Sequence, residues 1–224
     1  MREIVLDTET TGLEPELGHR VVEIACIELN NHLPTGVARR WYLNPDRDMP
    51  TEAYEVHGIN AEFLRAQPRF AEVADEFLSF VEGAPLVIHN AGFDIAFLNA
   101  ELHRAGRPPL PPGIAIDTLE IARRKFPGAQ ASLDALCRRF AIDNSARTKH
   151  GALLDAELLA EVYLELIGGR QPGLELIAGT AVETRLAIRV RREPRPPRPH
   201  APSAAELAAH AALLQRLRSP IWLS

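Results

Sequence analysis

Two carboxylates follow an apolar run near the start of the chain. Asp7 and Glu9 come directly after residues 4–6, which are Ile, Val and Leu. Residues two apart in a strand point to the same face, so these side chains lie side by side. Burying adjacent carboxylates costs free energy unless a cation, such as a divalent metal ion, neutralises them. A solvent-exposed pair is the alternative, but residues 4–6 look like a core strand, and α/β sheets tend to place sites at the C-terminal ends of such strands.

A third acid, Asp94, follows a second apolar run. This run covers residues 86–88, the turn 90–92 comes next, and Asp94 is expected in the first turn of the following helix. A single acid in that position usually complements the helix dipole, and we prefer this interpretation for Asp117 and Asp134, which also lie near helix starts. Asp94 differs from them because it again follows the C-terminal end of an apolar strand.

A histidine and a fourth acid lie near the start of the most regular helical segment. Apolar residues recur at helical spacing through residues 153–167. Gly151 separates His150 from this helix, which places His150 on the preceding loop or in the first turn. Asp155 lies beside apolar neighbours, where a carboxylate needs a partner. Taken alone, Asp155 could instead be an ordinary acid at the edge of the apolar stripe.

Together, Asp7, Glu9, Asp94, His150 and Asp155 match the needs of phosphodiester hydrolysis. That reaction requires an activated water, neutralised phosphate oxygens and a stabilised leaving oxygen, and two metal ions about 3.5–4 Å apart supply all three. Mg²⁺ prefers oxygen ligands, so a few carboxylates can hold such a pair. A neutral histidine can accept the proton of the attacking water, because its ordinary pKa is close to physiological pH. The five residues therefore predict a metal-dependent nuclease.

The elements around these residues predict an α/β fold. Three strands, near residues 3–6, 21–29 and 38–43, are separated by turn formers and are expected to form an antiparallel meander. The elements expected after them are helix 70–81, strand 85–89, helix 93–105, strand 114–116 and helices 118–126, 133–140 and 153–167. This order favours a mixed β-sheet flanked by helices on both faces.

Composition and charge limit the kind of nucleic-acid contact. The chain has 224 residues, of which 46% are hydrophobic, and a formal net charge of −5. A surface that grips nucleic acid broadly is usually basic, so contact is expected to be local or supported by metal ions.

A cytoplasmic location is expected from three features. The first apolar segment carries Asp7 and Glu9, which a signal peptide would not. No apolar run approaches the roughly 20 residues that span a bilayer. The cysteines, Cys26 and Cys137, form no CxxC pair and are interpreted as buried reduced thiols.

Composition changes near residue 170 and divides the chain into three predicted parts. Residues 1–170 are expected to form the catalytic domain, 171–202 a linker rich in Arg and Pro in its second half, and 203–224 a partner-binding segment. Residues 204–217 return to an Ala/Leu-rich helix, with Ser203 as its expected cap and Glu206 three residues on. One short helix cannot build a core alone, so it is expected to dock on a partner or fold back.

Three sequence motifs carry a family resemblance. They cover residues 5–13 (VLDTETTGL), 87–94 (VIHNAGFD) and 150–156 (HGALLDA), with the histidine five residues before the last aspartate. These motifs resemble the DEDDh branch of the DnaQ-like 3′→5′ exonuclease superfamily, over about residues 1–170. Residues 52–59 and 132–145 look most like the epsilon, or proofreading, subunits of bacterial DNA polymerase III.

The resemblance implies a ribonuclease H-like fold and an active site with two metal ions. Two divalent ions, Mg²⁺ or Mn²⁺, would be held by four carboxylates: Asp7, Glu9, Asp94 and Asp155. His150 is implied as the general base. Three further positions are implied to contact the terminal nucleotide of the substrate: Thr10, Glu52 and His57.

The same resemblance implies partners beyond a DNA 3′ end. Residues 203–224 would bind the polymerase III alpha subunit, and a theta-like subunit is a further implied partner. Residues 171–176 (QPGLEL) are similar to a peptide that binds the sliding clamp. Leu176 stands where an aromatic residue is often found, and an ordinary loop is the alternative for this segment.

Three other functions stay open at this point. A stand-alone exonuclease of the same superfamily would trim RNA or DNA ends with the same motifs, but it would have no evident use for the tail. A catalytically silent adaptor between polymerase and clamp would not need intact carboxylates and His150. A structural nucleic-acid-binding module is disfavoured by the acidic net charge.

Overall fold

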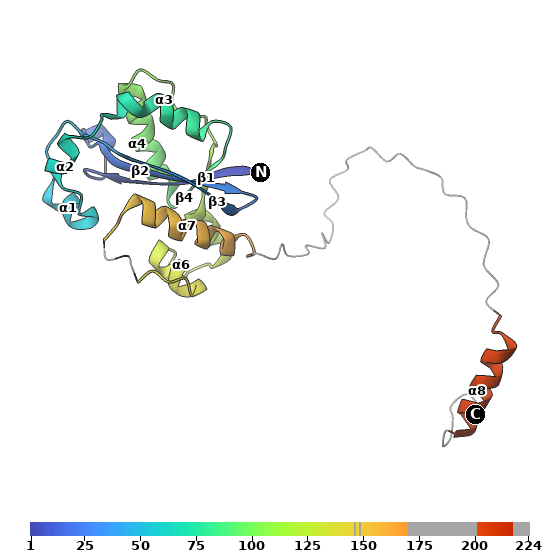
Figure 1. Cartoon of the computed structure of the whole chain (residues 1–224). Coiled ribbons are helices and arrows are strands. Elements are labelled where there is room, and N and C mark those ends of the chain that lie inside the picture. Colours follow the sequence, from blue (N-terminus) through green and yellow to red (C-terminus); the bar gives the residue numbers. More distant parts are fainter. Residues whose placement is uncertain (146, 148, 170–200, 217–224) are drawn as a thin grey trace. The chain divides into compact units, whose positions relative to one another are not determined.

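A computed structural model describes residues 1–145, 147, 149–169 and 201–216 of the chain (Figure 1). The predicted clamp-binding peptide, residues 171–176, lies outside the described residues, as does nearly all of the predicted linker. The catalytic part and the tail helix are therefore considered separately.

Five strands form one mixed sheet in the order β3-β2-β1-β4-β5 (Figure 1). β1 (Arg2–Thr10), β2 (Val21–Asn30) and β3 (Leu33–Tyr42) pair antiparallel. β4 (Leu86–Ile88) and β5 (Ala115–Asp117) continue the sheet in parallel beside β1. The predicted antiparallel meander and the predicted mixed sheet are both confirmed.

β3 begins at Leu33, whereas the sequence pattern places its start at residue 38. Asn31 and His32 have positive φ angles of 49° and 67°, so they form the two-residue turn that joins twisted antiparallel strands tightly. Residues 33–37 then extend the edge of the sheet with exposed side chains. Because these side chains face solvent, no apolar alternation marks the segment as a strand.

Helices cover both faces of the sheet, as the order of elements predicts. α3 (Phe70–Val81) and α4 (Ala91–Arg104) lie on one face. α5 (Thr118–Lys125), α6 (Leu133–Phe140) and α7 (Ala152–Leu166) lie on the other. Figure 1 shows α3 and α4 on one side of the strands and α6 and α7 on the opposite side.

β1 is buried on both of its faces. Ile4 and Leu6 pack into the core that includes Phe77 of α3 and Phe97 of α4. Val5, between them in sequence, packs into the other core with residues of α6 and α7. The alternation of a strand divides one apolar run between two cores, which places the end of β1 between two layers of helices.

Two short helices are not predicted by the sequence pattern. α1 (Thr51–His57) buries only His57, and α2 (Ala61–Arg65) buries only Leu64. A helix with one buried residue shows no apolar stripe, which is the signal on which such predictions depend. α1 matters for function because it carries two of the residues implied to contact substrate.

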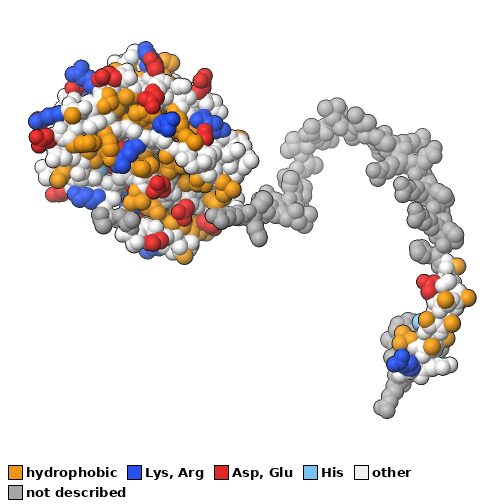
Figure 2. All heavy atoms as spheres, viewed as in Figure 1, with side chains coloured by type: hydrophobic (Ala, Val, Ile, Leu, Met, Phe, Trp, Pro, Cys, Tyr) orange, Lys and Arg blue, Asp and Glu red, His pale blue; other side chains and the backbone are white. Residues whose placement is uncertain are grey.

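The tail contains helix α8 (Ala204–Arg216), which confirms the predicted helix within the described residues. The Ser203 hydroxyl accepts from the Glu206 backbone N–H at 3.3 Å, and Glu206 Oε2 accepts from the Ser203 backbone N–H at 2.7 Å, so the predicted cap is formed. α8 buries no residue and exposes Leu207 and Leu213, and Figure 2 shows hydrophobic side chains along this helix. No helix in the described part of the chain is long and apolar enough to span a lipid bilayer.

Candidate active site

All five predicted catalytic residues line one cavity of about 730 Å³ at the C-terminal end of β1. Asp7 and Glu9 come from β1, and Asp94 comes from the first turn of α4, which follows β4. Asp155 lies in the first turn of α7, and His150 lies on the loop before it. We call this space the carboxylate cavity.

The carboxylates are buried, and hydrogen bonds and ion pairs from neighbouring side chains fix their orientation. Asp94 and Asp155 are almost fully buried, and Glu9 is 7% exposed. The Thr8 hydroxyl donates to Asp94 Oδ1 at 2.7 Å. His150 Nδ1 lies 3.2 Å from Asp155 Oδ2. The predicted set is therefore brought together with defined orientations.

Three of the carboxylates resist ionisation. Burial raises the pKa of Asp7 well above its ordinary value, and the charges of Asp94 and Glu9 raise it further. Burial, followed by the charge of Asp155, raises the pKa of Glu9 to about 8. Burial also raises the pKa of Asp94 to about 7, against the opposing hydrogen bond from Thr8. Crowded carboxylates of this kind are stabilised in their charged form by a bound cation.

The donor atoms fit a divalent metal ion. Glu9 and Asp155 each offer an oxygen and His150 offers a ring nitrogen, and these atoms lie within 4.8 Å of one another. Carboxylate oxygens are the ligands that Mg²⁺ takes in proteins, and Asp7 and Asp94 line the same cavity. The residues present therefore suit the metal chemistry that their spacing predicts.

Arg147 is a member of this site that the sequence reasoning missed. Its guanidinium donates to both oxygens of Asp155, with Nε–Oδ1 at 2.5 Å and Nη2–Oδ2 at 2.7 Å. Burial alone would raise the pKa of Asp155, but the hydrogen bonds from Arg147 and His150 outweigh it and the pKa lies below its ordinary value. The sequence shows an arginine three residues before His150, but the residues around it do not indicate that its side chain turns toward Asp155.

Glu23 of β2 is a second residue that the sequence reasoning missed. It is fully buried opposite Glu9 in the sheet register and accepts from Arg40 Nε at 2.6 Å. Its other oxygen accepts from the Ala152 backbone N–H at 3.4 Å, at the first residue of α7. Glu23 thus fastens the start of α7, and with it Asp155, to the sheet.

The two acids that we interpret as helix-start residues, Asp117 and Asp134, differ in their contacts. Asp117 accepts from the Leu119 backbone N–H at 2.8 Å as the N-cap of α5, which confirms that interpretation. Asp134 does lie in the first turn of α6, but its Oδ1 also accepts from Arg147 Nη1 at 2.8 Å. Asp134 is therefore linked to the site through Arg147.

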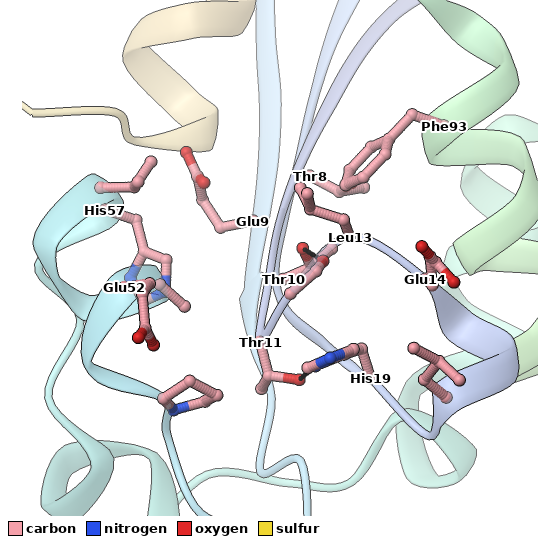
Figure 3. Close-up of a pocket in the computed structure, with 15 residues that line it drawn as sticks. Thr8, Glu9, Thr10, Thr11, Leu13, Glu14, His19, Glu52, His57 and Phe93 are labelled. Atoms are coloured by element: carbon pink, nitrogen blue, oxygen red, sulfur yellow. Dashed lines mark hydrogen bonds between the residues drawn. The ribbon is translucent and has the colours of Figure 1, made fainter.

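A second cavity, of about 540 Å³, adjoins the first (Figure 3). Thr8, Glu9 and Phe93 line both cavities. Its walls are largely apolar, with Leu13, Leu17, Val56 and Phe93 among the residues that line it. The three residues implied to contact substrate all line it as well: Thr10, Glu52 and His57. We call this space the apolar cavity.

His57 presents an unpaired donor in the apolar cavity. Its Nδ1 accepts from the Ile59 backbone N–H at 2.9 Å, so the neutral ring carries its proton on Nε2. Nε2 is buried and has no hydrogen-bond partner among the described residues. Burial, with the nearby charges of Lys149 and His150, lowers the pKa of His57 to about 4. The ring is therefore neutral near pH 7 and can donate to a bound ligand.

Two solved nuclease structures share the fold of the sheet and its helices. The catalytic part is similar to a zinc-bound E. coli exonuclease I in complex with single-stranded DNA, with a TM-score of 0.67 and 22% identity over 77% of this chain and 41% of that chain. It is also similar to the nuclease domain of 3′hExo, a DEDDh family member bound to rAMP, with a TM-score of 0.65 and 19% identity over 74% and 91% of the two chains. These similarities show that the described part of residues 1–169 has the ribonuclease H-like fold of this class of exonucleases.

Sequence comparison narrows this class. Residues 4–163 match the family model described as RNase_T, exonuclease. The DNA polymerase III subunit epsilon of Rickettsia conorii is 54% identical over 190 residues, which cover 84% of this chain and 83% of that protein. The Escherichia coli subunit is 45% identical over 223 residues, covering 95% and 92%. The chain belongs to this exonuclease family, in the group formed by the DNA polymerase III epsilon subunits.

Proposed function

We propose that the chain removes nucleotides one at a time from DNA 3′ ends and proofreads within a DNA polymerase III assembly. The observation that carries this proposal is the meeting of five residues, distant in sequence, in one cavity that adjoins an apolar cavity of nucleotide-compatible chemistry. Membership of the exonuclease family, with epsilon subunits as relatives at 45–56% identity, supports the same activity.

Four carboxylates would hold the metal ions of the reaction: Asp7, Glu9, Asp94 and Asp155. Two divalent ions, Mg²⁺ or Mn²⁺, would supply charge neutralisation at the phosphate and a more acidic water. Thr8 keeps Asp94 oriented through its hydroxyl, and Glu23 keeps α7 in place beneath Asp155. The protein thus contributes a fixed set of oxygen atoms whose mutual repulsion makes them receptive to cations.

His150 is the proposed general base. Half of its side chain is exposed, so its ring can reach a water at the mouth of the carboxylate cavity. A neutral imidazole accepts the proton of that water as it attacks phosphorus. The His150 backbone N–H donates to the Val56 carbonyl of α1 at 3.1 Å, which fixes the loop that carries the base.

The apolar cavity would hold the terminal nucleotide. Leu13, Val56 and Phe93 offer the apolar walls that a base and sugar can contact. Glu52 and the free Nε2–H of His57 offer polar contacts, and both belong to α1. Thr10 also lines the cavity and remains a proposed contact of the nucleotide, with its hydroxyl oriented by donation to the Gly12 carbonyl at 2.6 Å.

The proposed partners are those of a polymerase subunit. The tail, residues 203–224, would bind the polymerase alpha subunit, and the exposed Leu207 and Leu213 of α8 give it an apolar surface to do so. Clamp binding by residues 171–176 and contact with a theta-like subunit rest on sequence resemblance. The proposed division into domain 1–170, linker 171–202 and tail 203–224 rests on the change in composition near residue 170. The proposed cytoplasmic location rests on the acidic first segment, the lengths of the apolar runs and the cysteine pattern.

The test is degradation of a 3′-mismatched primer–template, compared with the matched duplex, single-stranded DNA and RNA, in Mg²⁺ and then in EDTA. We expect stepwise loss of 3′ nucleotides from DNA that is faster at the mismatch and stops in EDTA. Preference for short RNA would retain the mechanism but contradict proofreading. No hydrolysis of any substrate by folded protein would contradict the proposed activity.

A further inference from the structure

Arg147 places a permanent positive charge inside the carboxylate cavity. Its side chain is only 8% exposed and its guanidinium contacts three groups. Two nitrogens bond both oxygens of Asp155, Nη1 lies 2.8 Å from Asp134 Oδ1, and Nη2 lies 2.8 Å from His150 Nδ1. The guanidinium therefore spans a proposed metal ligand and the proposed general base.

The pairing with Asp155 conflicts with its use as a metal ligand. A bidentate guanidinium occupies the facing lone pairs of both carboxylate oxygens. Arginine cannot lose its proton in a protein, so the charge can leave Asp155 only if the side chain moves. A divalent ion on the same buried carboxylate would repel a guanidinium at hydrogen-bond distance strongly, because little water screens them.

Asp134 offers the displaced side chain an anchor. Its carboxylate already accepts Nη1 of Arg147, and 42% of its side chain is exposed, so its charge is partly solvated. Asn144 Nδ2 also donates to Asp134 Oδ1 at 3.0 Å, which holds the acceptor in place. The guanidinium can thus give up Asp155 while it keeps its bond to Asp134.

We propose that Arg147 is a built-in substitute cation: it neutralises Asp155 while no metal ion is bound, and a divalent ion displaces it from Asp155 onto Asp134. This inference rests on the proposed metal site. Asp155 is the one acid of the four that bonds an arginine within the described residues, and the guanidinium holds both of its oxygens. Linkage makes the coupling reciprocal, so removing the arginine strengthens metal binding.

The direction of that effect separates competition from a structural role. A residue that only builds the site would weaken Mg²⁺ binding when it is replaced, whereas a competitor strengthens it. Arg147→Met keeps much of the apolar stem and removes the charge, and we expect Mg²⁺ affinity, measured by calorimetry on EDTA-stripped protein, to rise about ten-fold. Arg147→Lys keeps a charge but loses the two-pronged bond, so a smaller rise is expected.

Arg123→Met is the matched control. Arg123 is exposed, lines the same cavity and forms no hydrogen bond with the four carboxylates among the described residues. The substitution Arg123→Met removes the same charge but no group that competes with Mg²⁺ for Asp155. Its effect on Mg²⁺ affinity should therefore be much smaller than that of Arg147→Met. Nitrogen-15 NMR of the Arg147 Nε–H offers a second readout, in which adding Mg²⁺ to the wild-type chain should shift the resonance of this Asp155-bonded group.

The outcomes separate the two proposals. Stronger Mg²⁺ binding by Arg147→Met, with a shifted Nε–H resonance in the wild type, supports displacement. Unchanged or weaker binding, or an Nε–H resonance that ignores Mg²⁺, overturns it while leaving the metal site intact. If Arg147→Met does not fold, Arg147→Lys decides by the same sign. A wild-type chain that binds no Mg²⁺ overturns the metal site and this inference together.

Discussion

The carboxylate cavity and the apolar cavity share a wall, but the first needs a bound cation for its chemistry and the second does not. The first gathers four acids, three of which have raised pKa values because burial and mutual repulsion oppose their charge. The second has apolar walls and a few polar groups, of which His57 already has a settled protonation state. Chemistry in the first depends on a cation from outside the chain, whereas the second is formed by the chain alone.

Glu9 and Phe93 link the two cavities, because both side chains line both spaces. Under the proposed function, a nucleotide in the apolar cavity would lie next to the carboxylates. The difference between the cavities predicts that replacing any of the four carboxylates removes metal binding and catalysis together, whereas substitutions in the apolar cavity affect catalysis alone.

The largest effect is expected from Asp7→Ala. Loss of a metal ligand should lower the rate of hydrolysis by at least about 10³-fold, since metal-ion catalysis contributes several kcal/mol. The metal-free variant should melt no lower than the wild type, because the lost carboxylate is destabilised by burial and by its neighbours. Nuclease assays and thermal melts in EDTA measure both. A folded Asp7→Ala protein with full activity would refute the proposed site.

A smaller effect is expected from His57→Ala. Loss of the Nε2–H donor should loosen the terminal nucleotide and lower the rate by about 10²-fold, as misplacement of a substrate typically does. Mg²⁺ affinity should be unchanged, because His57 lines only the apolar cavity. Glu55→Ala is the control, since Glu55 is exposed on the same helix and lines neither cavity. Equal loss of Mg²⁺ affinity and rate would show that the cavities do not act separately.

The raised pKa values also predict how metal-free stability depends on pH. Between pH 6.5 and 8 the folded protein releases the protons of Glu9 and Asp94, whose pKa values are about 8 and 7, whereas the unfolded chain has already released them below this window. Stability therefore falls as pH rises through this window, by about 2 kcal/mol, because each bound proton is worth about 1.4 kcal/mol per pH unit.

Urea unfolding in EDTA at the two pH values measures this fall. Glu9→Gln should show a smaller fall, since the glutamine does not titrate. His57 does not contribute, because its lowered pKa of about 4 affects stability only below its ordinary value of 6.5. If stability in EDTA stayed constant or rose between pH 6.5 and 8, the raised pKa values of these acids would be contradicted.

The smallest effect on hydrolysis is expected from deleting residues 191–224. The residues that line the two cavities all come from the part of the chain before residue 170, so the rate on DNA should be unchanged. Binding to the polymerase alpha subunit should weaken, because the deletion removes the proposed binding segment. Co-purification of the two chains measures this, and unchanged co-purification would refute the assigned role of the tail.

The sequence by itself determined the parts of this protein that depend on local patterns. Apolar alternation and helical spacing locate the meander and the large helices because each element buries a continuous stripe. The positions of Asp7 and Glu9 follow, since both lie toward the C-terminal end of β1, and Asp94 follows as the acid in the first turn of the helix after β4. These features need only a few neighbouring residues to be recognised.

Only the tertiary structure decided how the site is neutralised and held. Arg147 reaches Asp155, and Glu23 caps a helix 129 residues away, through contacts that no local pattern records. α1, which carries Glu52 and His57, buries a single residue, so its sequence has no apolar stripe from which a helix could be predicted. A buried charged side chain needs a partner of opposite charge, because burying it alone costs free energy. Which residue becomes that partner is decided by how the helices pack on the sheet, and sequence spacing does not show it.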